Sequence, residues 1–177
     1  MNPILLLVSV AVLAGMVGCK PADPKLTVSS TAFTDGQSIP VKYTSQGADI
    51  SPPLHWDGAP AATQSFVLFC DDPDAPGGTW SHWVVFNLPS ATNSLPEAVP
   101  SSEDLPGGAH QGLNSFQKIG YGGPAPPAGP AHRYYFKVYA LDTILSVQAR
   151  PDESVVLQAM QGHILAQGQL MGRYQRQ

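Results

Sequence analysis

Three stretches of the chain repeat their apolar residues at every second position, which is the pattern of β-strands. Alternate side chains of a strand share one face, so in each stretch one ionisable residue stands in line with the apolar ones. His132 opens its stretch, His82 opens another, and Asp72 closes the third. The apolar positions in line with them are Tyr134, Phe136, Val138 and Ala140; Val84, Phe86 and Leu88; and Phe66, Leu68 and Cys70. If the strand that ends at Asp72 runs antiparallel to the other two, the three ionisable groups meet at one rim of the sheet, above an apolar floor.

The residues next to two of these groups point the other way. Asp71 precedes Asp72 and Ser81 precedes His82, so both are expected on the opposite face. Ser81 is therefore poorly placed to use His82 as the base of a nucleophilic pair. The chain also contains no Gly-x-Ser-x-Gly sequence, which would mark a nucleophile elbow.

The rest of the chain predicts a mainly β domain with one helix near its C-terminus. Further strands are expected at 26–29, 39–44 and 169–174. The helix begins after Asp152, a favoured N-cap residue, and ends at Gly168. Its apolar stripe at helical spacing is Val155, Val156, Ala159, Met160, Ile164 and Leu165. Residues 89–129 are rich in Gly, Pro, Ser and Asn and predict a long ordered excursion across the surface.

The N-terminus reads as a secretion signal. Residues 4–17 are uncharged and almost wholly apolar, but too few to span a bilayer comfortably. They run into Met16-Val17-Gly18-Cys19, which resembles the lipobox of bacterial lipoproteins, where the cysteine is lipidated and becomes the mature N-terminus. We therefore expect a signal peptide at 1–18, a tether at 19–25 and one domain at 26–177. The expected location is the bacterial cell envelope, lipid-anchored at the outer membrane or its periplasmic face, with ordinary secretion as the alternative.

Charge and cysteine content exclude two classes of protein. Charged residues make up 12% of the chain and the formal net charge is −4, so no basic face for nucleic-acid binding is expected. Only two cysteines exist, and with Cys19 lipidated none remains to pair with Cys70. No disulfide framework is therefore expected, and Cys70 is interpreted as a small buried hydrophobe.

Four motifs stand in order along the chain: Asp72-Pro-Asp-Ala-Pro76, Trp80-Ser-His82, Tyr121-Gly-Gly-Pro-Ala-Pro-Pro127 and His132-Arg-Tyr134. Together they resemble the phosphatidylethanolamine-binding protein (PEBP) family, most closely its bacterial branch, which is often labelled Raf-kinase-inhibitor-like. The similarity runs from about residue 26 to residue 174. It implies a fold of two mainly antiparallel sheets with peripheral helices, including one C-terminal α-helix. It also implies a small pocket that accepts phosphate-like anions.

The resemblance can be carried over residue by residue. The implied ligand-binding residues are Asp72, His82, His132, Tyr134, Gly123 and Pro124. The first three coincide with the rim inferred from alternation. Each imidazole can offer an N–H to a phosphate oxygen, and Asp72 can accept from one imidazole and orient it. Bacterial relatives often have cysteine where this chain has Ala125, so any role of that thiol is absent here.

The expected function is that of a membrane-tethered binding protein for phosphate-bearing ligands such as phospholipid head groups, with no enzymatic activity, cofactor or metal. Two alternatives stay open. Several members of the family act as inhibitors, which favours a protein that blocks a kinase or protease with its surface, through the 89–129 region. Two histidines and a carboxylate are also a ligand set for zinc or non-heme iron, which would suit a metal-dependent hydrolase.

Overall fold

The computed structural model describes residues 24–177. The expected signal peptide at 1–18 and Cys19 lie outside the described residues, as does most of the tether at 19–25. None of the helices formed by residues 24–177 combines the length and the apolar character that a membrane span requires.

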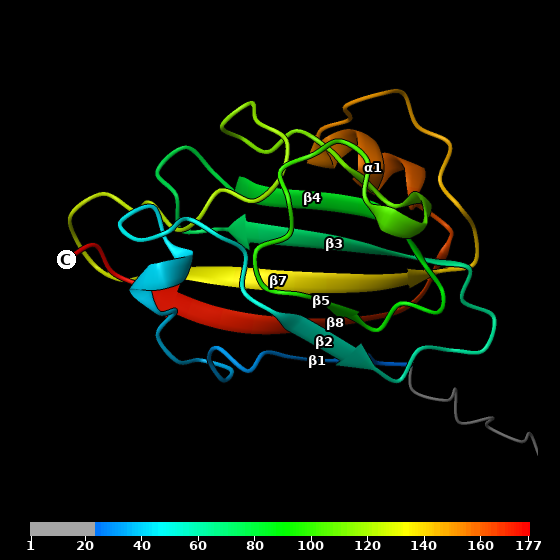
Figure 1. Cartoon of the computed structure of the whole chain (residues 1–177), viewed down its shortest axis with the longest axis horizontal. Helices are drawn as coiled ribbons and strands as arrows, with labels where there is room; N and C mark the ends of the chain where they lie inside the picture. Colours follow the sequence, from blue (N-terminus) through cyan, green and yellow to red (C-terminus); the bar gives the residue numbers. More distant parts are fainter. Residues whose placement is uncertain (1–23) are drawn as a thin grey trace, which may run out of the picture.

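Residues 24–177 fold into two antiparallel sheets with a single α-helix (Figure 1). The strands are β1 (Thr27–Ser29), β2 (Leu54–Asp57), β3 (Ser65–Asp72), β4 (Trp80–Pro89), β5 (Ser94–Leu95), β6 (His110–Gln111), β7 (His132–Leu141) and β8 (Ile164–Tyr174). The helix α1 covers Glu153–Ala159, and two short 3-10 turns are η1 (Val41–Tyr43) and η2 (Pro106–Gly108). The small sheet has the order β1-β2-β5 and the large sheet the order β6-β4-β3-β7-β8. This architecture confirms the predicted mainly β, two-sheet fold with one C-terminal helix.

The central strand β3 is buried along its whole length, because both faces of the large sheet are covered. One face packs against the small sheet, and its core includes Phe66, Leu68 and Cys70 from β3. The other face packs against α1 and the segment before it, and its core includes Val67 and Phe69. Period-two alternation along β3 therefore divides its side chains between two separate cores.

Two irregularities in the pairing of β3 with β4 change which side chains of β4 share a face. The register passes from Phe66–Leu88 to Leu68–Val85, and from Cys70–Trp83 to Asp71–Ser81. His82 consequently has no partner on β3, as expected for the extra residue of a β-bulge.

The alternation predicted for residues 82–88 is therefore wrong. Val84 and Phe86 pack into the core beneath α1, whereas Trp83, Val85 and Leu88 pack into the core between the sheets. The predicted face of β7 is correct, because Tyr134, Phe136, Val138 and Ala140 all belong to the core between the sheets.

The C-terminal helix is shorter than the apolar stripe predicts. Asp152 is the N-cap, and its carboxylate accepts a hydrogen bond from the Val155 amide as expected. However, α1 ends at Ala159, a turn with Gly162 at φ +82° follows, and β8 begins at Ile164. Gly168 lies inside β8 instead of ending a helix. It is required there because a Cβ would collide with the carbonyl of Leu26.

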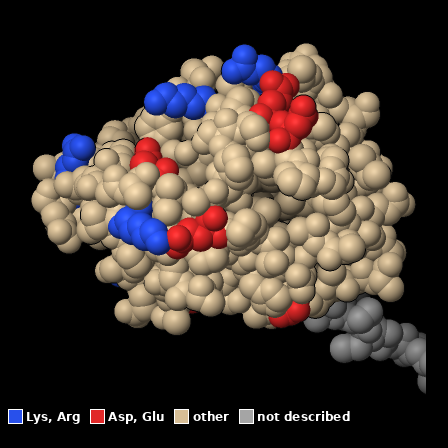
Figure 2. Space-filling view, in the orientation of Figure 1, with Lys and Arg blue, Asp and Glu red and all other residues tan. Residues whose placement is uncertain are grey.

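Two further segments, residues 39–44 and 89–129, differ in how well the sequence predicted them. Residues 39–44 do not form the predicted strand: Ile39 donates one backbone bond to Arg173, and η1 follows directly after Pro40. Residues 89–129 are ordered as predicted, and they contain β5, η2 and β6. On the face of the described residues in Figure 2, charged side chains stand singly or in small groups of mixed sign, separated by wide uncharged surface.

Candidate functional site

Asp72 and His132 form a buried pair where β3 ends and β7 begins, in the interior of the large sheet. Because β3 and β7 are antiparallel, the end of one lies beside the start of the other. His132 Nδ1 lies 2.8 Å from Asp72 Oδ2, and both residues are almost inaccessible to solvent. The second carboxylate oxygen, Oδ1, accepts from the backbone amide of Asp74 at 2.9 Å. Asp72 therefore orients the imidazole and closes the loop that follows β3.

His82 reaches the same face from the bulge at the start of β4. Its Nδ1 lies 2.6 Å from the carbonyl oxygen of Gly122, so this nitrogen carries the proton and donates. The ring packs edge-on against Tyr134, with centroids 5.2 Å apart, and against Phe116 at 5.4 Å. Burial lowers the pKa of His82 below its usual range, although the Gly122 carbonyl and the charge of Asp72 act in the opposite direction.

Both imidazoles are thus held through the same nitrogen. The hydrogen bonds that His82 and His132 form within residues 24–177 use Nδ1, and the structure shows none from either Nε2. In a neutral ring with a proton on Nδ1, Nε2 carries a lone pair. A second proton on the ring converts Nε2 into a hydrogen-bond donor.

Tyr134 adds a hydroxyl to the cluster. Its oxygen is buried and has no hydrogen-bond partner among the described residues. Burial, followed by the charge of Asp72, raises the pKa of Tyr134 well above its usual range, so the phenol stays protonated. A buried hydroxyl without a partner is destabilising, and it marks a place where an incoming acceptor would be favoured.

Two hollows border the cluster, one on each side. The first has a volume of about 370 Å³ and is lined by Phe116, Tyr121, Gly122 and Gly123 among others. The second has a volume of about 550 Å³ and is lined by His132, Asp74, Arg133 and Arg173 among others. Asp72 and His82 line neither hollow; the cluster reaches the second hollow through His132 and adjoins the first through Phe116 and Gly122, which contact His82.

Four of the six predicted ligand residues lie together, and Gly123 adjoins them through its backbone next to His82. Asp72, His82, His132 and Tyr134 form the continuous cluster described above. Gly123 lines the first hollow, but its amide already donates to Asp49 Oδ1 at 2.7 Å. A side chain at this position would collide with the backbone of Thr44. Pro124 packs away from the cluster, and its carbonyl accepts two hydrogen bonds from Ser45.

The segment 114–123 supplies contacts that the sequence pattern did not single out. Asn114 accepts the amides of Phe116 and Lys118 and donates to the Gly120 carbonyl, which closes a tight loop. This loop brings Phe116 against His82. Phe116 also stacks edge-on with the partly exposed Trp80 at 5.4 Å. The run Asn114-Ser-Phe does carry the signal of a side-chain-capped turn, because asparagine often bonds to its own backbone.

The loop after β3 is joined to β7 by a charged pair. Asp74 binds Arg133 through Nη2 at 2.6 Å, through Nε and through the backbone amide. The Arg133 guanidinium lowers the pKa of Asp74 to about 2. Trp80 and Phe116 form an aromatic rim beside His82. Trp83 is fully buried and donates to Gln111, so it is not part of this rim.

The side chains of the cluster are hydrogen-bonding groups that are not arranged around a common metal position. Within residues 24–177, no group of three His, Cys, Asp or Glu side chains is arranged to hold a metal ion. The groups that face the cluster are a tyrosine hydroxyl and two imidazoles, all of which can act as hydrogen-bond donors.

Comparison with known proteins identifies the fold family. The family model described as phosphatidylethanolamine-binding protein matches residues 29–175. The chain belongs to the PEBP family. A UPF0098 protein of Methanothermobacter thermautotrophicus is 47% identical over 151 residues, which span 85% of this chain and 99% of the relative. A UPF0098 protein of Aquifex aeolicus is 46% identical over 153 residues, 85% of this chain and 89% of the relative.

Two solved PEBP-family structures have the same architecture. A putative PEBP homologue from Chlamydia trachomatis superposes with a TM-score of 0.79 at 41% identity, covering 87% of this chain and 99% of the other. Escherichia coli YbcL, described as a new member of the mammalian PEBP family, superposes with a TM-score of 0.80 at 33% identity, covering 86% and 99%. This PEBP chain is therefore a ligand-binding protein of the family type, and its relatives include archaeal as well as bacterial proteins.

Proposed function

We propose that this PEBP protein binds small phosphate-bearing anions, such as phospholipid head groups, at Asp72, His82, His132 and Tyr134, as a binding protein without enzymatic activity. One observation carries the proposal. Both imidazoles are fixed through Nδ1, so both Nε2 atoms remain available beside a buried tyrosine hydroxyl that has no partner. Charge-assisted bonds from imidazolium to phosphate are among the stronger polar contacts.

Binding in this geometry requires a proton. Each Nε2 donates only when its ring is charged, and burial of His82 opposes that charge. A bound phosphate offsets this penalty by supplying the opposite charge. We therefore expect phosphate affinity to rise as the pH falls from 8 to 6, with at most about a tenfold change per pH unit for each proton taken up.

The group attached to the phosphate would lie against the aromatic rim. Trp80 is partly exposed and packs against Phe116, which lines the first hollow and contacts His82. The ammonium of an ethanolamine head group is attracted to the face of such a ring. Lipidation of Cys19 would hold the domain close to a membrane that contains these head groups.

The experiment is a titration of the domain with phosphoethanolamine, followed by ¹⁵N NMR. We expect saturable shifts at the amides around His82, Gly122 and His132. The variants His82→Ala and His132→Ala should each weaken binding at least tenfold, about 1.4 kcal/mol. The matched control is His163→Ala, which removes an exposed imidazole that pairs with Asp142 far from the cluster in sequence. Absence of saturable shifts in the unmodified protein, or equal loss in the control, would contradict the proposal.

A further inference from the structure

The two strands that carry the candidate site also carry polar side chains on the opposite face. Asp71 on β3 and Ser81 on β4 are register partners, and both side chains are buried on the side that α1 covers. They are joined there by Lys137 from β7 and Glu153 from the first turn of α1. None of these four residues contributes to the cluster around Asp72.

Asp71 forms an ion pair with Lys137. Its Oδ2 accepts from Lys137 Nζ at 2.8 Å, and its side chain is completely buried. The other oxygen, Oδ1, is buried without a hydrogen-bond partner among the described residues. Because Lys137 balances Asp71, no second cation in the described part of the chain is available to the next carboxyl group in this cluster.

Glu153 is that carboxylate. No ion pair within residues 24–177 involves it. Burial, together with the nearby charge of Asp71, raises the pKa of Glu153 to about 7. A carboxyl group in this condition lacks a positive partner, and a cation placed beside it would favour its charged form.

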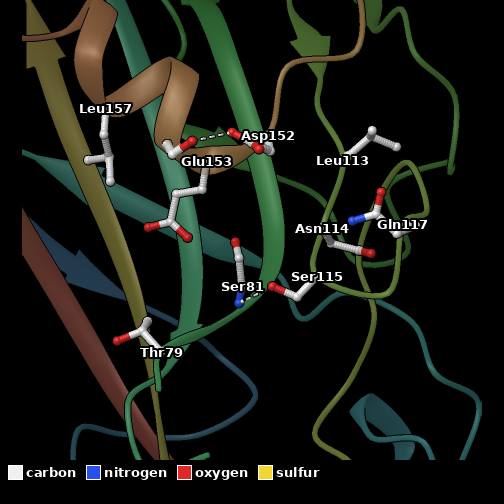
Figure 3. Close-up of a pocket in the computed structure, with 10 residues that line it drawn as sticks. Thr79, Ser81, Leu113, Asn114, Ser115, Gln117, Asp152, Glu153 and Leu157 are labelled. Carbon is white, nitrogen blue, oxygen red and sulfur yellow. Dashed lines mark hydrogen bonds between the residues drawn. The ribbon is translucent and has the colours of Figure 1, made fainter. Parts of the chain in front are cut away.

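The Ser81 hydroxyl faces Glu153 and lies close enough to lower the pKa of that carboxyl group. Its residue is only 6% exposed, and Oγ has no hydrogen-bond partner in the described chain. Its backbone is held firmly, since the amide donates to Ser115 Oγ at 2.9 Å and the carbonyl accepts from the Ser115 amide at 2.8 Å. In Figure 3 the Ser81 hydroxyl and the Glu153 carboxyl extend toward each other from β4 and α1.

Both side chains line a cavity of about 370 Å³ between β4, α1 and the 113–117 loop. Its lining contains the carboxylates of Asp152 and Glu153 but no lysine, arginine or histidine. Asp152 Oδ1 accepts from Ser154 and from the Val155 amide, whereas Glu153 has only the neutral Ser81 hydroxyl and the Asp71 carboxylate beside it and, within residues 24–177, no cation paired with it. The hydroxyls of Thr79 and Ser81 add neutral acceptors, and Leu113 and Leu157 supply apolar edges.

We propose that this cavity binds a small primary ammonium ion, paired with Glu153 and hydrogen-bonded to the Ser81 hydroxyl, with its short apolar tail against Leu113 and Leu157. An ammonium group has three N–H donors and one positive charge. It therefore matches one unpaired carboxylate together with neutral oxygen acceptors. A divalent cation suits the cavity less well, because its lining offers one free carboxylate and the adjacent Asp71 is already neutralised by Lys137.

Ammonium binding is linked to a proton with a defined sign. The bound cation stabilises the carboxylate form of Glu153, so binding at or below pH 7 releases a proton. Affinity should consequently increase from pH 6 to pH 8. This is the reverse of the pH dependence expected for anions at the His82 and His132 cluster, so the two sites can be told apart in one protein.

The test is a ¹⁵N NMR titration with propylammonium at pH 6 and pH 8. We expect saturable shifts at the amides of Ser81, Ser115 and Glu153, with affinity about five- to tenfold higher at pH 8. Tetramethylammonium has the same charge but no N–H, and propanol has the tail but no charge. Both should bind at least about tenfold more weakly than propylammonium, a difference of about 1.4 kcal/mol.

Two variants complete the test. Glu153→Gln keeps the shape of the side chain and should reduce propylammonium affinity at least about tenfold at pH 8. Its matched control is Glu103→Gln, an exposed glutamate outside this cavity, which should leave affinity unchanged. Ser81→Ala should reduce affinity by a smaller factor. The proposal is overturned if tetramethylammonium binds as well as propylammonium, if Glu153→Gln binds normally, or if no saturable shift occurs at pH 8.

Discussion

The large sheet carries two polar clusters back to back, and they satisfy their buried carboxylates in different ways. On the face toward the small sheet, Asp72 is paired with the imidazole of His132. On the face toward α1, Asp71 is paired with the ammonium of Lys137 and is followed by a second carboxyl group, Glu153. Consecutive residues of one strand therefore enter opposite environments, because successive side chains of a strand point to opposite faces.

The difference lies in what each cluster leaves unpaired. The cluster of Asp72, His82, His132 and Tyr134 leaves a hydroxyl and two ring nitrogens that become donors on protonation, which suits an anion. The cluster of Asp71, Ser81, Lys137 and Glu153 leaves oxygen acceptors and a carboxyl group, which suits a cation. The same pair of strands thus presents opposite chemistry on its two faces.

The largest expected effect comes from removing the cation that contacts Asp71. Lys137→Met removes the only cation that contacts Asp71 within residues 24–177 and leaves a fully buried charge. We expect a loss of about 3 kcal/mol in the free energy of unfolding, measured by urea denaturation at pH 7. The part of Lys137 that reaches solvent keeps the loss at the lower end of the range for buried pairs.

The matched change on the other face should be much smaller. His132→Asn keeps a donor for Asp72, since the asparagine amide replaces Nδ1–H, and we expect a loss of about 1 kcal/mol or less. Phosphate binding should still weaken, because Nε2 is removed. Equal destabilisation by the two variants would contradict the distinction between a buried carboxylate that loses its cation and one that keeps a hydrogen-bond donor.

The next effect is a pH dependence of opposite sign for the two faces. The folded pKa of Glu153 is about 7 against an ordinary 4.5, so the folded state holds its proton more tightly. Its contribution to stability is complete below pH 4.5 and is lost as the pH rises through 7. With allowance for the exposed part of the carboxyl group, unmodified protein should lose about 2 kcal/mol relative to Glu153→Gln between pH 4.5 and pH 8.

His82 should behave in the reverse sense. Its folded pKa is lowered from 6.5, so its contribution is present above pH 6.5 and is lost as the pH falls through the folded value. Relative to His82→Asn, which keeps a donor for the Gly122 carbonyl, unmodified protein should become less stable toward acid. Chemical denaturation of the three proteins at each pH measures both effects. A stability difference that does not change with pH in either variant would show that the corresponding group does not titrate as described.

The sequence predicted the outline of the first cluster because two of its strands are regular. Asp72 and His132 follow strict alternation on β3 and β7, and the antiparallel pairing brings them together. His82 reaches the same face only because β4 contains a bulge, which alternation along one strand does not predict. The residues after it, Trp83 and Val85, face the core between the sheets, so His82 and Trp83 are neighbours on one face only because of the bulge. A bulge depends on how two strands pair, which the pattern of one strand does not contain.

The sequence pattern predicted only part of the second cluster. Alternation correctly placed Asp71 and Ser81 away from Asp72 and His82, but it could not bring Glu153 to them. That contact depends on how α1 docks, and the apolar stripe merged α1 with the start of β8. Val156 and Met160 are helical and buried, whereas Ile164 lies in the strand. A short helix followed closely by a strand gives the same spacing over two turns, so periodicity alone does not locate the boundary.

The smallest expected effect concerns the aromatic rim, and it depends on the proposed anion site. Trp80 packs edge-on against Phe116 and remains partly exposed, so Trp80→Ala should lower the free energy of unfolding by about 1 kcal/mol or less. Its effect on binding should depend on the ligand. Phosphoethanolamine carries an ammonium that can lie over the indole, and loss of that contact corresponds to about a two- to fivefold weaker Kd. Inorganic phosphate has no such group, and its affinity should not change. The control Ile144→Ala removes another exposed apolar side chain and should affect neither ligand. An equal loss for phosphate and phosphoethanolamine in Trp80→Ala would mean that Trp80 supports the shape of the His82 cluster through Phe116, and that the rim does not select the group attached to the anion.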